Sequence, residues 1–264
     1  MIKPPDHGPD TPGAGWRGLL RGRCQICQQW HGAAICSDCL ARFLPSTPRC
    51  RRCALALAAQ RSAAAETAIS ADARVDLCAD ICTTCQALPP LFESAVALAD
   101  YGFPWDRLVA RLKFQQHPEL AGLLGRLMAG AVARSGHRAA QLVVPVPLTP
   151  TRLAERGYNQ AWQLARSLAA TLRLPTRADV LERWLDAPHQ VGANRQQRQD
   201  NLRDAIWVDP QQRRHLRGRH VALVDDVLTT GVTAHAASAA LLAAGAASVQ
   251  VWVLTRTPAP EFDI

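Results

Sequence analysis

Two adjacent acids and a hydroxyl-rich loop stand between an apolar run and an apolar helix at residues 221–233. Asp225 and Asp226 follow the apolar run 221–224, where neighbouring carboxylates can accept hydrogen bonds from two adjacent hydroxyls of a ligand. Unpaired N–H groups at the start of the helix that follows attract phosphate. The segment therefore predicts a site for a phosphorylated sugar. The loop residues expected to hold the phosphate are Thr229, Thr230, Gly231 and Thr233.

Three rival motifs fit this segment less well. A buried strand that ends in two solvated acids before a helix cap would not need the glycine and the threonines in this order. A P-loop needs a lysine in G-x-x-x-x-G-K-[ST], and no lysine follows Gly231. A dinucleotide-binding fold needs G-x-G-x-x-G after a strand, and no expected strand of this sequence is followed by that motif. The order of residue types thus favours a sugar phosphate.

Eight of the nine cysteines form four C-x-x-C pairs, all before residue 86. Two thiolates of one tight turn can face one metal ion, and two such turns complete a tetrahedron. Disulfides are the main alternative, but a reducing cytosol keeps thiols free, and a redox motif would be a single pair. Four pairs therefore predict two structural Zn²⁺ sites. The pairs are Cys24/Cys27, Cys36/Cys39, Cys50/Cys53 and Cys82/Cys85.

The sequence leaves the pairing of these turns open. Sequential use joins the first pair to the second and the third to the fourth, whereas interleaved use joins the first to the third. Cys78 is expected to be a free thiol, although it could replace Cys82 as a ligand. His31 could compete as a ligand, but a solvated loop histidine is the simpler expectation. Closed Cys₄ sites have no open position for a substrate, so both ions are expected to be structural.

The elements that must position the acid pair begin at Phe92 and alternate between strands and helices. This alternation predicts an α/β fold with a parallel sheet and flanking helices. Ligands then bind at the carboxyl ends of the strands, where Asp225 and the loop 145–149 would both lie. Strands are expected at 93–101, 141–147, 178–184, 219–226 and 247–255, and helices at 104–114, 118–134, 159–172 and from the threonine loop to about Ala244.

Length and composition suggest one medium-sized domain preceded by a small cysteine-rich module. No uncharged apolar stretch of 18 residues is present, and the N-terminus lacks the apolar core of a signal peptide, so we expect no membrane insertion and a cytoplasmic location. The formal net charge of +8 falls to about +4 if eight thiolates bind two Zn²⁺ ions, which permits nucleic-acid binding without requiring it. The expected divisions are a disordered leader 1–18, a cysteine module 19–90 with an Ala-rich insertion at about 54–73, a domain 91–257 and a tail 258–264.

The segment 221–233 resembles the phosphoribosyl-pyrophosphate (PRPP) signature of type I phosphoribosyltransferases. The resemblance implies that Asp225 and Asp226 hold the ribose 2′- and 3′-hydroxyls and that the loop after them holds the 5′-phosphate. The segment 144–160, VPVPLTPTRLAERGYNQ, closely resembles the P-x-P-L…R…RG-[FY]-NQ run of the ComF family, a competence-associated branch of these proteins. This likeness puts 145–149 at the position of the pyrophosphate loop. The residues implied there or close by are Pro147, Leu148, Thr149 and Arg152.

Further segments of the chain resemble the same family. The segment 101–113 is similar to its aromatic–glycine start, with Lys113 at the end, and ComF-type chains carry a double zinc-ribbon-like N-terminus. The segment 190–201 resembles its Q-x-G-L…R…N stretch but has Ala193 where leucine is usual. Arg198 and Asn201 are expected in a flap over the sugar, although a charged surface helix accounts for this composition equally well. The resemblance covers about residues 20–257.

The resemblance implies a protein that binds PRPP with Mg²⁺ and transfers phosphoribose to an unidentified acceptor, with a role in competence and DNA uptake or processing. Asp225 and Asp226 would then be catalytic, because they orient the sugar and favour its developing positive charge. Two alternatives stay open: a non-catalytic PRPP or nucleotide sensor, and a scaffold of the DNA-uptake machinery that binds single-stranded DNA or competence proteins. An aromatic content of 5% disfavours a base-stacking platform as the sole function. The fold resemblance is also compatible with a homodimer.

Overall fold

The computed structural model describes residues 22–57, 80–184 and 206–258 of the 264-residue chain. Contacts divide the chain into two compact units, Met1–Pro45 and Ser46–Ile264. The expected leader 1–18 lies outside the described residues, as do most of the expected insertion and tail, and the domain limits expected from sequence stay a prediction.

The smaller unit is built around two short strands and a helix. Strands β1 (Gly22–Arg23) and β2 (Trp30–His31) pair antiparallel, and helix α1 (Ser37–Phe43) follows. Cys36 is the N-cap of α1, and its side chain accepts a hydrogen bond from the backbone N–H of Cys39. The C-x-x-C spacing thus brings its second cysteine into the first turn of a helix.

The larger unit begins with a segment of similar construction. A tight turn at Cys50–Cys53 is closed by an antiparallel bridge between Arg49 and Ala56. Helix α3 (Thr83–Ala87) then starts at Cys82, which is its N-cap. Each of the two cysteine segments therefore combines a tight turn with the start of a short helix.

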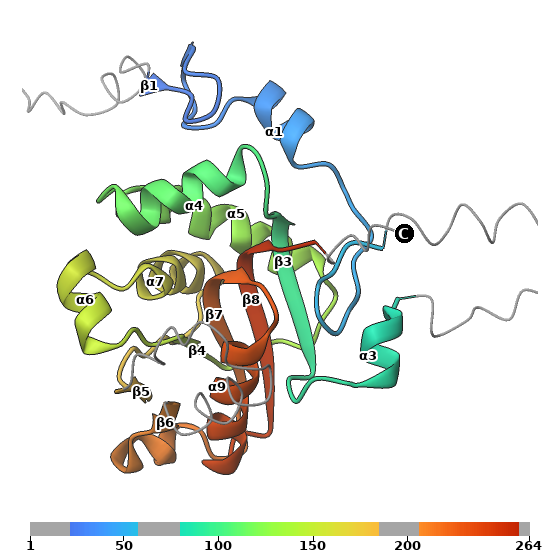
Figure 1. Cartoon of the computed structure of the whole chain (residues 1–264), viewed down its shortest axis with the longest axis vertical. Coiled ribbons are helices and arrows are strands. Elements are labelled where there is room, and N and C mark those ends of the chain that lie inside the picture. Colours follow the sequence, from blue (N-terminus) through green and yellow to red (C-terminus); the bar gives the residue numbers. More distant parts are fainter. Residues whose placement is uncertain (1–21, 58–79, 185–205, 259–264) are drawn as a thin grey trace, which may run out of the picture. The chain divides into compact units, whose positions relative to one another are not determined.

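A four-stranded sheet forms the centre of the larger unit (Figure 1). Its strands are all parallel and lie in the order β3-β8-β7-β4, which confirms the parallel sheet expected from the strand–helix alternation. Most residues of these strands are buried, as expected of a parallel sheet covered by helices on both faces. The strands are β3 (Ser94–Asp100), β4 (Leu142–Pro145), β7 (His220–Leu228) and β8 (Ser248–Arg256).

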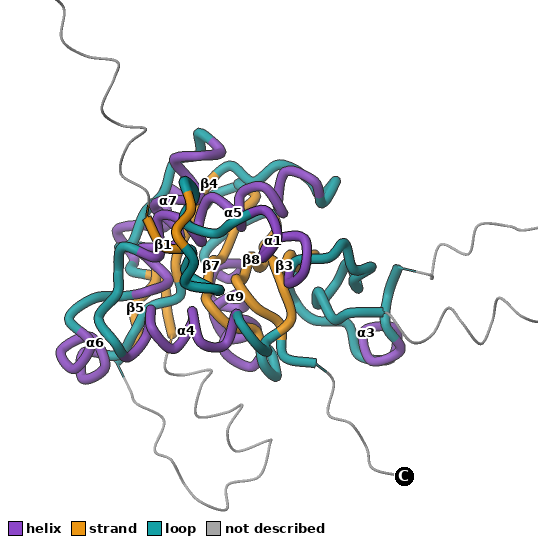
Figure 2. The backbone as a smooth tube through the Cα atoms, turned by 90° about the horizontal axis from the view of Figure 1, so that it is seen from above, coloured by secondary structure: helices purple, strands orange, loops and turns teal. Residues whose placement is uncertain are grey.

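Helices cover both faces of this sheet (Figure 2). Helices α5 (Leu120–Arg134) and α7 (Gln160–Leu172) pack on one face, and α9 (Val232–Ala243) packs on the other. Val221 and Leu223 of β7 share a core cluster with α9 residues such as Leu241. Because side chains alternate along a strand, residues 221, 223 and 225 of β7 face α9 and residues 222, 224 and 226 face the opposite side. Helices α4 (Trp105–Phe114) and α6 (Pro150–Arg156) follow the ends of β3 and β4.

A second, two-stranded sheet lies beside this core. The strand expected near 178–184 is found as β5 (Leu181–Arg183), and it pairs antiparallel with β6 (Ile206–Val208). Strand β6 and the following 3₁₀ helix η1 (Pro210–His215) were not predicted from the sequence. A three-residue strand is too short to show a clear period of alternating side chains. The expected flap residues Arg198 and Asn201 lie outside the described residues.

The contact between α5 and α7 gives a first prediction. A Cβ atom at Gly125 would lie 2.6 Å from Ser167 Cβ and 3.0 Å from the Leu164 carbonyl oxygen. Gly125→Ala should therefore lower the free energy of unfolding by about 1–3 kcal/mol in chemical denaturation, because the helices would have to separate.

The matched control for this prediction is Gly122→Ala on the same helix. The nearest atom to a Cβ at that position is the flexible Arg126 guanidinium nitrogen, at 3.8 Å. This variant should be neutral or more stable by up to about 1 kcal/mol, because alanine favours helix. Equal destabilisation of both variants would contradict the close approach at Gly125.

Candidate functional site

The two acids lie inside β7 and not at its very end. The strand was expected to leave the sheet at Asp225 and Asp226, but it continues to Leu228. Both acids therefore keep the alternating directions of strand side chains. Asp225 points to the side of α9, as Leu223 does, and its Oδ1 accepts a hydrogen bond of 2.8 Å from the backbone N–H of Asp226.

A small hollow opens where β7 gives way to α9. Gly231 is the N-cap of α9 and has a φ of 81°, a left-handed conformation that glycine adopts without strain. The hollow brings Asp225 together with every loop residue that was expected to hold phosphate. Val146, at the exit of β4, lies in the same wall. The lining residues are Val146, Leu223, Asp225, Val227, Leu228, Thr229, Thr230, Gly231, Val232, Thr233, Ala234, Val251 and Val253.

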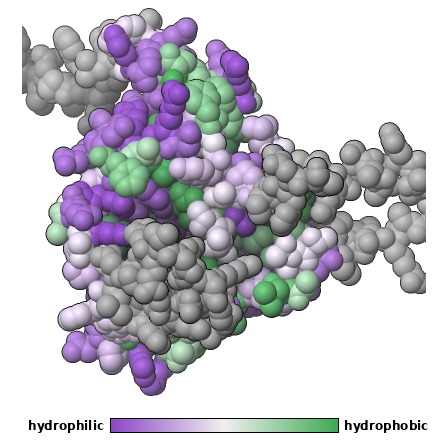
Figure 3. Space-filling view, viewed as in Figure 1, coloured by the Kyte–Doolittle hydropathy of each residue, from purple (hydrophilic) through white to green (hydrophobic). Residues whose placement is uncertain are grey.

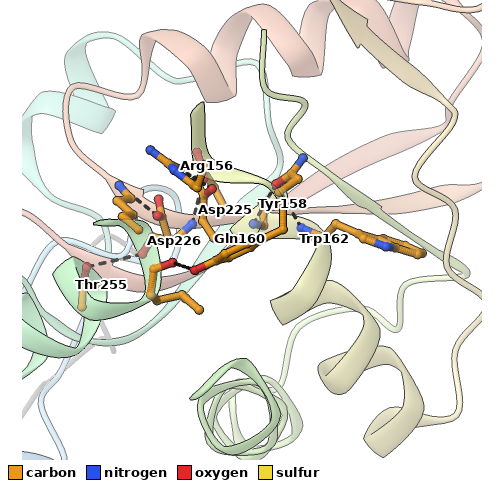
Figure 4. A network of polar contacts seen from close by, with 11 residues as sticks. Arg156, Tyr158, Gln160, Trp162, Asp225, Asp226 and Thr255 are labelled. Atoms are coloured by element: carbon orange, nitrogen blue, oxygen red, sulfur yellow. Dashed lines mark hydrogen bonds and ion pairs between the residues drawn. The ribbon is translucent and has the colours of Figure 1, made fainter. Parts of the chain in front are cut away.

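Asp226 is directed to the opposite side of the strand, away from this hollow. Its Oδ2 lies 2.9 Å from Lys113 Nζ at the end of α4, and its side chain is only 3% exposed. Its carbonyl oxygen accepts a hydrogen bond of 3.4 Å from Thr255 Oγ1 on β8. Figure 4 shows both acids within one network of polar contacts. The two side chains thus leave β7 in different directions, but their carboxyls remain close enough for the charge of Asp226 to act on Asp225.

The environment of Asp225 changes its ionisation. Burial and the neighbouring charge of Asp226 together raise the pKa of Asp225 to about 8, although the ammonium of Lys113 opposes this shift. The folded structure therefore favours the protonated form of Asp225. Perturbed carboxyls of this kind are typical of functional sites.

The expected pyrophosphate loop follows β4, the neighbour of β7 in the sheet. The backbone N–H of Val146 donates to the Val224 carbonyl at 2.9 Å, which holds the two strand exits together. Thr149 is buried and caps α6, its Oγ1 accepting a hydrogen bond from the backbone N–H of Arg152 at 3.4 Å. Of the other residues expected there, Pro147 is buried, Leu148 is partly buried, and Arg152 is exposed on the first turn of α6.

The segment 156–160, RGYNQ, connects three parts of this region (Figure 4). Asn159 caps α7 and donates from Nδ2 to the Val146 carbonyl at 3.0 Å. The Tyr158 hydroxyl donates to the Leu112 carbonyl in the last turn of α4, one residue before Lys113. The segment therefore ties the end of α4 and the β4 exit to the start of α7.

Arg156 completes this segment. Its guanidinium donates to Gln160 Oε1 and lies 5.4 Å from the ring centroid of the exposed Phe114. Lys113, next to Phe114, is the residue of this region whose role was not predicted from the sequence. One signal was available: Lys113 is one of only two lysines among 30 basic residues. Its partner Asp226 could not be inferred, because 113 residues separate them in the sequence.

The eight cysteines that the structure describes form two groups of four, and the sequential pairing is the one observed. Within each group the Sγ atoms all lie within 4.8 Å of one another. Sγ of Cys27 and Cys36 are 3.9 Å apart, and those of Cys53 and Cys82 are 3.7 Å apart. A disulfide needs about 2 Å, whereas the edge of a tetrahedral Zn–S₄ site is about 3.8 Å for Zn–S bonds of about 2.3 Å. The groups are Cys24, Cys27, Cys36 and Cys39, and Cys50, Cys53, Cys82 and Cys85.

Backbone N–H groups point at sulfurs in both groups. Cys36 N–H donates to Cys24 Sγ at 3.4 Å, and Cys82 N–H donates to Cys50 Sγ at 3.3 Å. Such contacts favour the thiolate form that a metal ion requires. His31 is not a member of either group; its Nδ1 accepts a hydrogen bond from Ala33 N–H. Cys78 lies outside the described residues.

The described surface is mixed in character. Among the described helices, none has both the length and the apolar composition needed to cross a membrane. On the face that Figure 3 shows, hydrophobic side chains of the described residues form small separate patches among hydrophilic ones. Large exposed hydrophobic side chains in the larger unit include Phe103, Phe114 and Trp184.

Comparison with known proteins gives matches for both sequence and fold. The model of the phosphoribosyl transferase domain family matches residues 127–264. The DNA utilization protein YhgH of Escherichia coli K12 is 34% identical over 180 residues, which are 67% of this chain and 78% of that protein. Competence protein F of Haemophilus influenzae is also 34% identical over 180 residues, with 66% and 78% of the two chains covered.

Among solved structures, the glutamine PRPP amidotransferase of Bacillus subtilis matches 52% of this chain and 26% of its own. The identity is 20% and the TM-score 0.37, so this likeness supports no argument of its own. The family model and the sequence relatives are sufficient without it. The chain therefore belongs to the phosphoribosyl transferase domain family and, within it, to the ComF group that includes competence protein F and the DNA utilization proteins.

Proposed function

We propose that the protein binds PRPP together with Mg²⁺ and transfers its phosphoribosyl group to an acceptor. The observation that carries this proposal is the hollow that joins Asp225 to the loop of Thr229, Thr230, Gly231 and Thr233 at the start of α9. A helix start with unpaired N–H groups attracts the 5′-phosphate, and the carboxylate accepts hydrogen bonds from ribose hydroxyls.

The transfer step breaks the bond between ribose C1 and the pyrophosphate oxygen while the acceptor forms a bond to C1. Positive charge develops on the sugar, as in glycoside cleavage, and the carboxylates of Asp225 and Asp226 stabilise it electrostatically. The backbone N–H groups of Leu148 and Thr149, which follow Pro147, and the guanidinium of Arg152 are assigned to the pyrophosphate. Mg²⁺, if it enters with PRPP, would supply further charge neutralisation of the leaving group.

We also propose that each cysteine group holds one Zn²⁺ ion with a structural role. The Sγ separations match the edge of a tetrahedral site, and four thiolates leave no open coordination position. Such thiolate sites need a reducing compartment, which supports a cytoplasmic location. The names of the relatives support a role in competence and DNA utilization.

The proposal is tested by a matched pair of glycine variants. Gly231 and Gly218 both have positive φ, at 81° and 68°, but Gly218 lies near the opposite end of β7. Alanine at either position should cost about 1–2 kcal/mol of stability. Only Gly231→Ala should also weaken PRPP binding in calorimetry with Mg²⁺, because it changes the loop that receives the phosphate.

The same proteins are then assayed for pyrophosphate release with candidate bases, amines and single-stranded DNA as acceptors. Release that depends on Gly231 supports transfer. If PRPP binds but no candidate acceptor causes release of pyrophosphate, the protein would be a PRPP sensor and not a transferase. If the wild type does not bind PRPP, and the wild type and both glycine variants bind single-stranded DNA, the proposal is rejected. The protein would then be a DNA-binding scaffold.

A further inference from the structure

Arg256, the last residue of β8, contacts the start of the loop 229–233, which is proposed to bind the phosphate and is called the phosphate loop below. Its Nη1 donates to the carbonyl oxygens of Leu228 at 2.9 Å and Thr229 at 2.6 Å. The same nitrogen lies 2.8 Å from the carbonyl oxygen of Thr257. Hydrogen bonds from a guanidinium are stronger than those between neutral groups, so these contacts fix the direction of the two loop carbonyls.

The direction of a carbonyl also fixes the direction of the next N–H group. The peptide bonds after Leu228 and Thr229 are trans, and in a planar trans peptide the C=O and the N–H point in opposite directions. With both carbonyls turned to Arg256, the N–H groups of Thr229 and Thr230 point away from it. Arg256 thus orients two backbone donors at the loop that is proposed to receive the phosphate.

The other side of the same guanidinium is fixed by a cysteine turn. Arg256 Nε donates to the Cys53 carbonyl at 3.0 Å, and Cys53 belongs to the group of Cys50, Cys82 and Cys85. This turn is packed against Leu57 and Ile81 in a small core of its own. One side chain therefore connects the second cysteine group with the loop at the start of α9.

We propose that Arg256 is a positioning residue that orients the phosphate-binding amides of Thr229 and Thr230 and takes its own position from the Cys53 turn. The proposal rests on the proposed function for the identity of the ligand. Arginine suits this task because its planar fork presents several donors in fixed directions, whereas the single ammonium of lysine does not. The cysteine group is then a support of the sugar site and not only a separate folding unit.

Arg49 provides a matched control for this inference. It contacts the same cysteine segment, with Nη1 3.1 Å from the Ala54 carbonyl and 2.7 Å from Asp100 Oδ1. Neither of these contacts involves the phosphate loop. Arg49→Met and Arg256→Met each remove one arginine that ties the segment to the sheet, but only Arg256→Met removes a donor from the Leu228 and Thr229 carbonyls. The Leu228 carbonyl keeps its hydrogen bond of 3.1 Å from the Thr257 N–H, so the larger effect is expected at the peptide bond after Thr229.

The first measurement is hydrogen exchange of the intact, ligand-free protein. Arg256→Met should increase the exchange rate of amides 229–233 about 10-fold or more, and Arg49→Met should leave these amides within about 2-fold of the wild type. Arg256→Lys should restore the rates only in part. Unchanged exchange of the loop in Arg256→Met, or an equal increase in Arg49→Met, would overturn the inference. Because no ligand is present, this result is independent of whether the wild type binds PRPP.

The second measurement is the affinity for ribose 5-phosphate and for inorganic phosphate, which report on the phosphate end alone. Arg256→Met should weaken ribose 5-phosphate about 10-fold, while Arg49→Met should change it less than 2-fold. Equal affinities of the two variants would reject an orienting role for Arg256. If the wild type binds neither compound but the hydrogen-exchange result is as expected, the proposed ligand is rejected. The inference that Arg256 orients the loop would still hold.

Discussion

Asp225→Asn is expected to weaken PRPP binding by about 100-fold or more and, at the same time, to raise the thermal stability of the protein near and above pH 8. An amide has the size of the carboxylate but offers one acceptor oxygen instead of two. Hydrogen bonds to a charged group contribute about 1.5–3 kcal/mol each, so losing the charge at a sugar-binding position is costly. The measurements are calorimetry with PRPP and Mg²⁺ and thermal unfolding as a function of pH.

The stability gain follows from the direction of the pKa shift. Burial and Asp226 raise the pKa of Asp225 to about 8 in the folded state, from an ordinary value of 3.8. A raised pKa means that the folded state favours the protonated form, so this group's contribution to stability is fully present below about pH 4. It is lost as the pH rises to about 8. Asparagine carries no charge to bury, so the difference in unfolding temperature between Asp225→Asn and the wild type should grow across this range and then level off.

Asp179→Asn is a control because the pKa of Asp179 is shifted in the opposite direction to that of Asp225. The hydrogen bonds from Arg177 lower the pKa of Asp179, so its ionised form stabilises the folded state and the contribution is lost as the pH falls. Asp179→Asn should therefore lower stability slightly at neutral pH and leave PRPP binding unchanged. A loss of stability in Asp225→Asn at pH 8 would show that the carboxylate is well compensated in the free protein.

The sequence predicted those features that depend on local order. Threonines, a glycine and an apolar helix in succession predicted the loop at Gly231, and the structure places these residues around one hollow with Asp225. The C-x-x-C pairs predicted two tetrahedral groups, because both ligands of a pair are close in sequence. Strand–helix alternation predicted the parallel sheet, which long buried strands such as β7 and β8 make easy to recognise.

Features that depend on distant contacts were not predictable in this way. The ion pair of Lys113 with Asp226 and the contact of Arg256 with Cys53 each join residues more than 100 positions apart. The opposite directions of Asp225 and Asp226 depend on β7 continuing past the acids, which adjacent acids by themselves do not indicate. The choice between sequential and interleaved cysteine pairing was likewise made by the fold, since both obey the same local spacing.

Cys50→Ser and Cys24→Ser are expected to have very different consequences, although each removes one ligand from a group of the same chemistry. Cys50 is buried, and its group is joined to the sheet by hydrogen bonds from Ala95 N–H to the Arg51 carbonyl at 3.0 Å and from Arg256 to the Cys53 carbonyl. Metal binding to such sites contributes about 10–16 kcal/mol in isolated zinc peptides, so even partial loss is large for a domain of ordinary stability. We therefore expect Cys50→Ser to lower the unfolding temperature of the unit Ser46–Ile264 by more than about 10 °C.

Cys24 belongs to the other compact unit, Met1–Pro45, so Cys24→Ser should unfold that unit and leave the main calorimetric transition within about 2 °C of the wild type. Each variant should lose one zinc ion per chain by elemental analysis. Hydrogen exchange of amides 229–233 should increase only in Cys50→Ser, because Arg256 then loses its fixed partner at Cys53. If both variants shifted the main transition equally, the second cysteine group would have no special connection to the sheet, and its proposed support of the phosphate loop would fail with it.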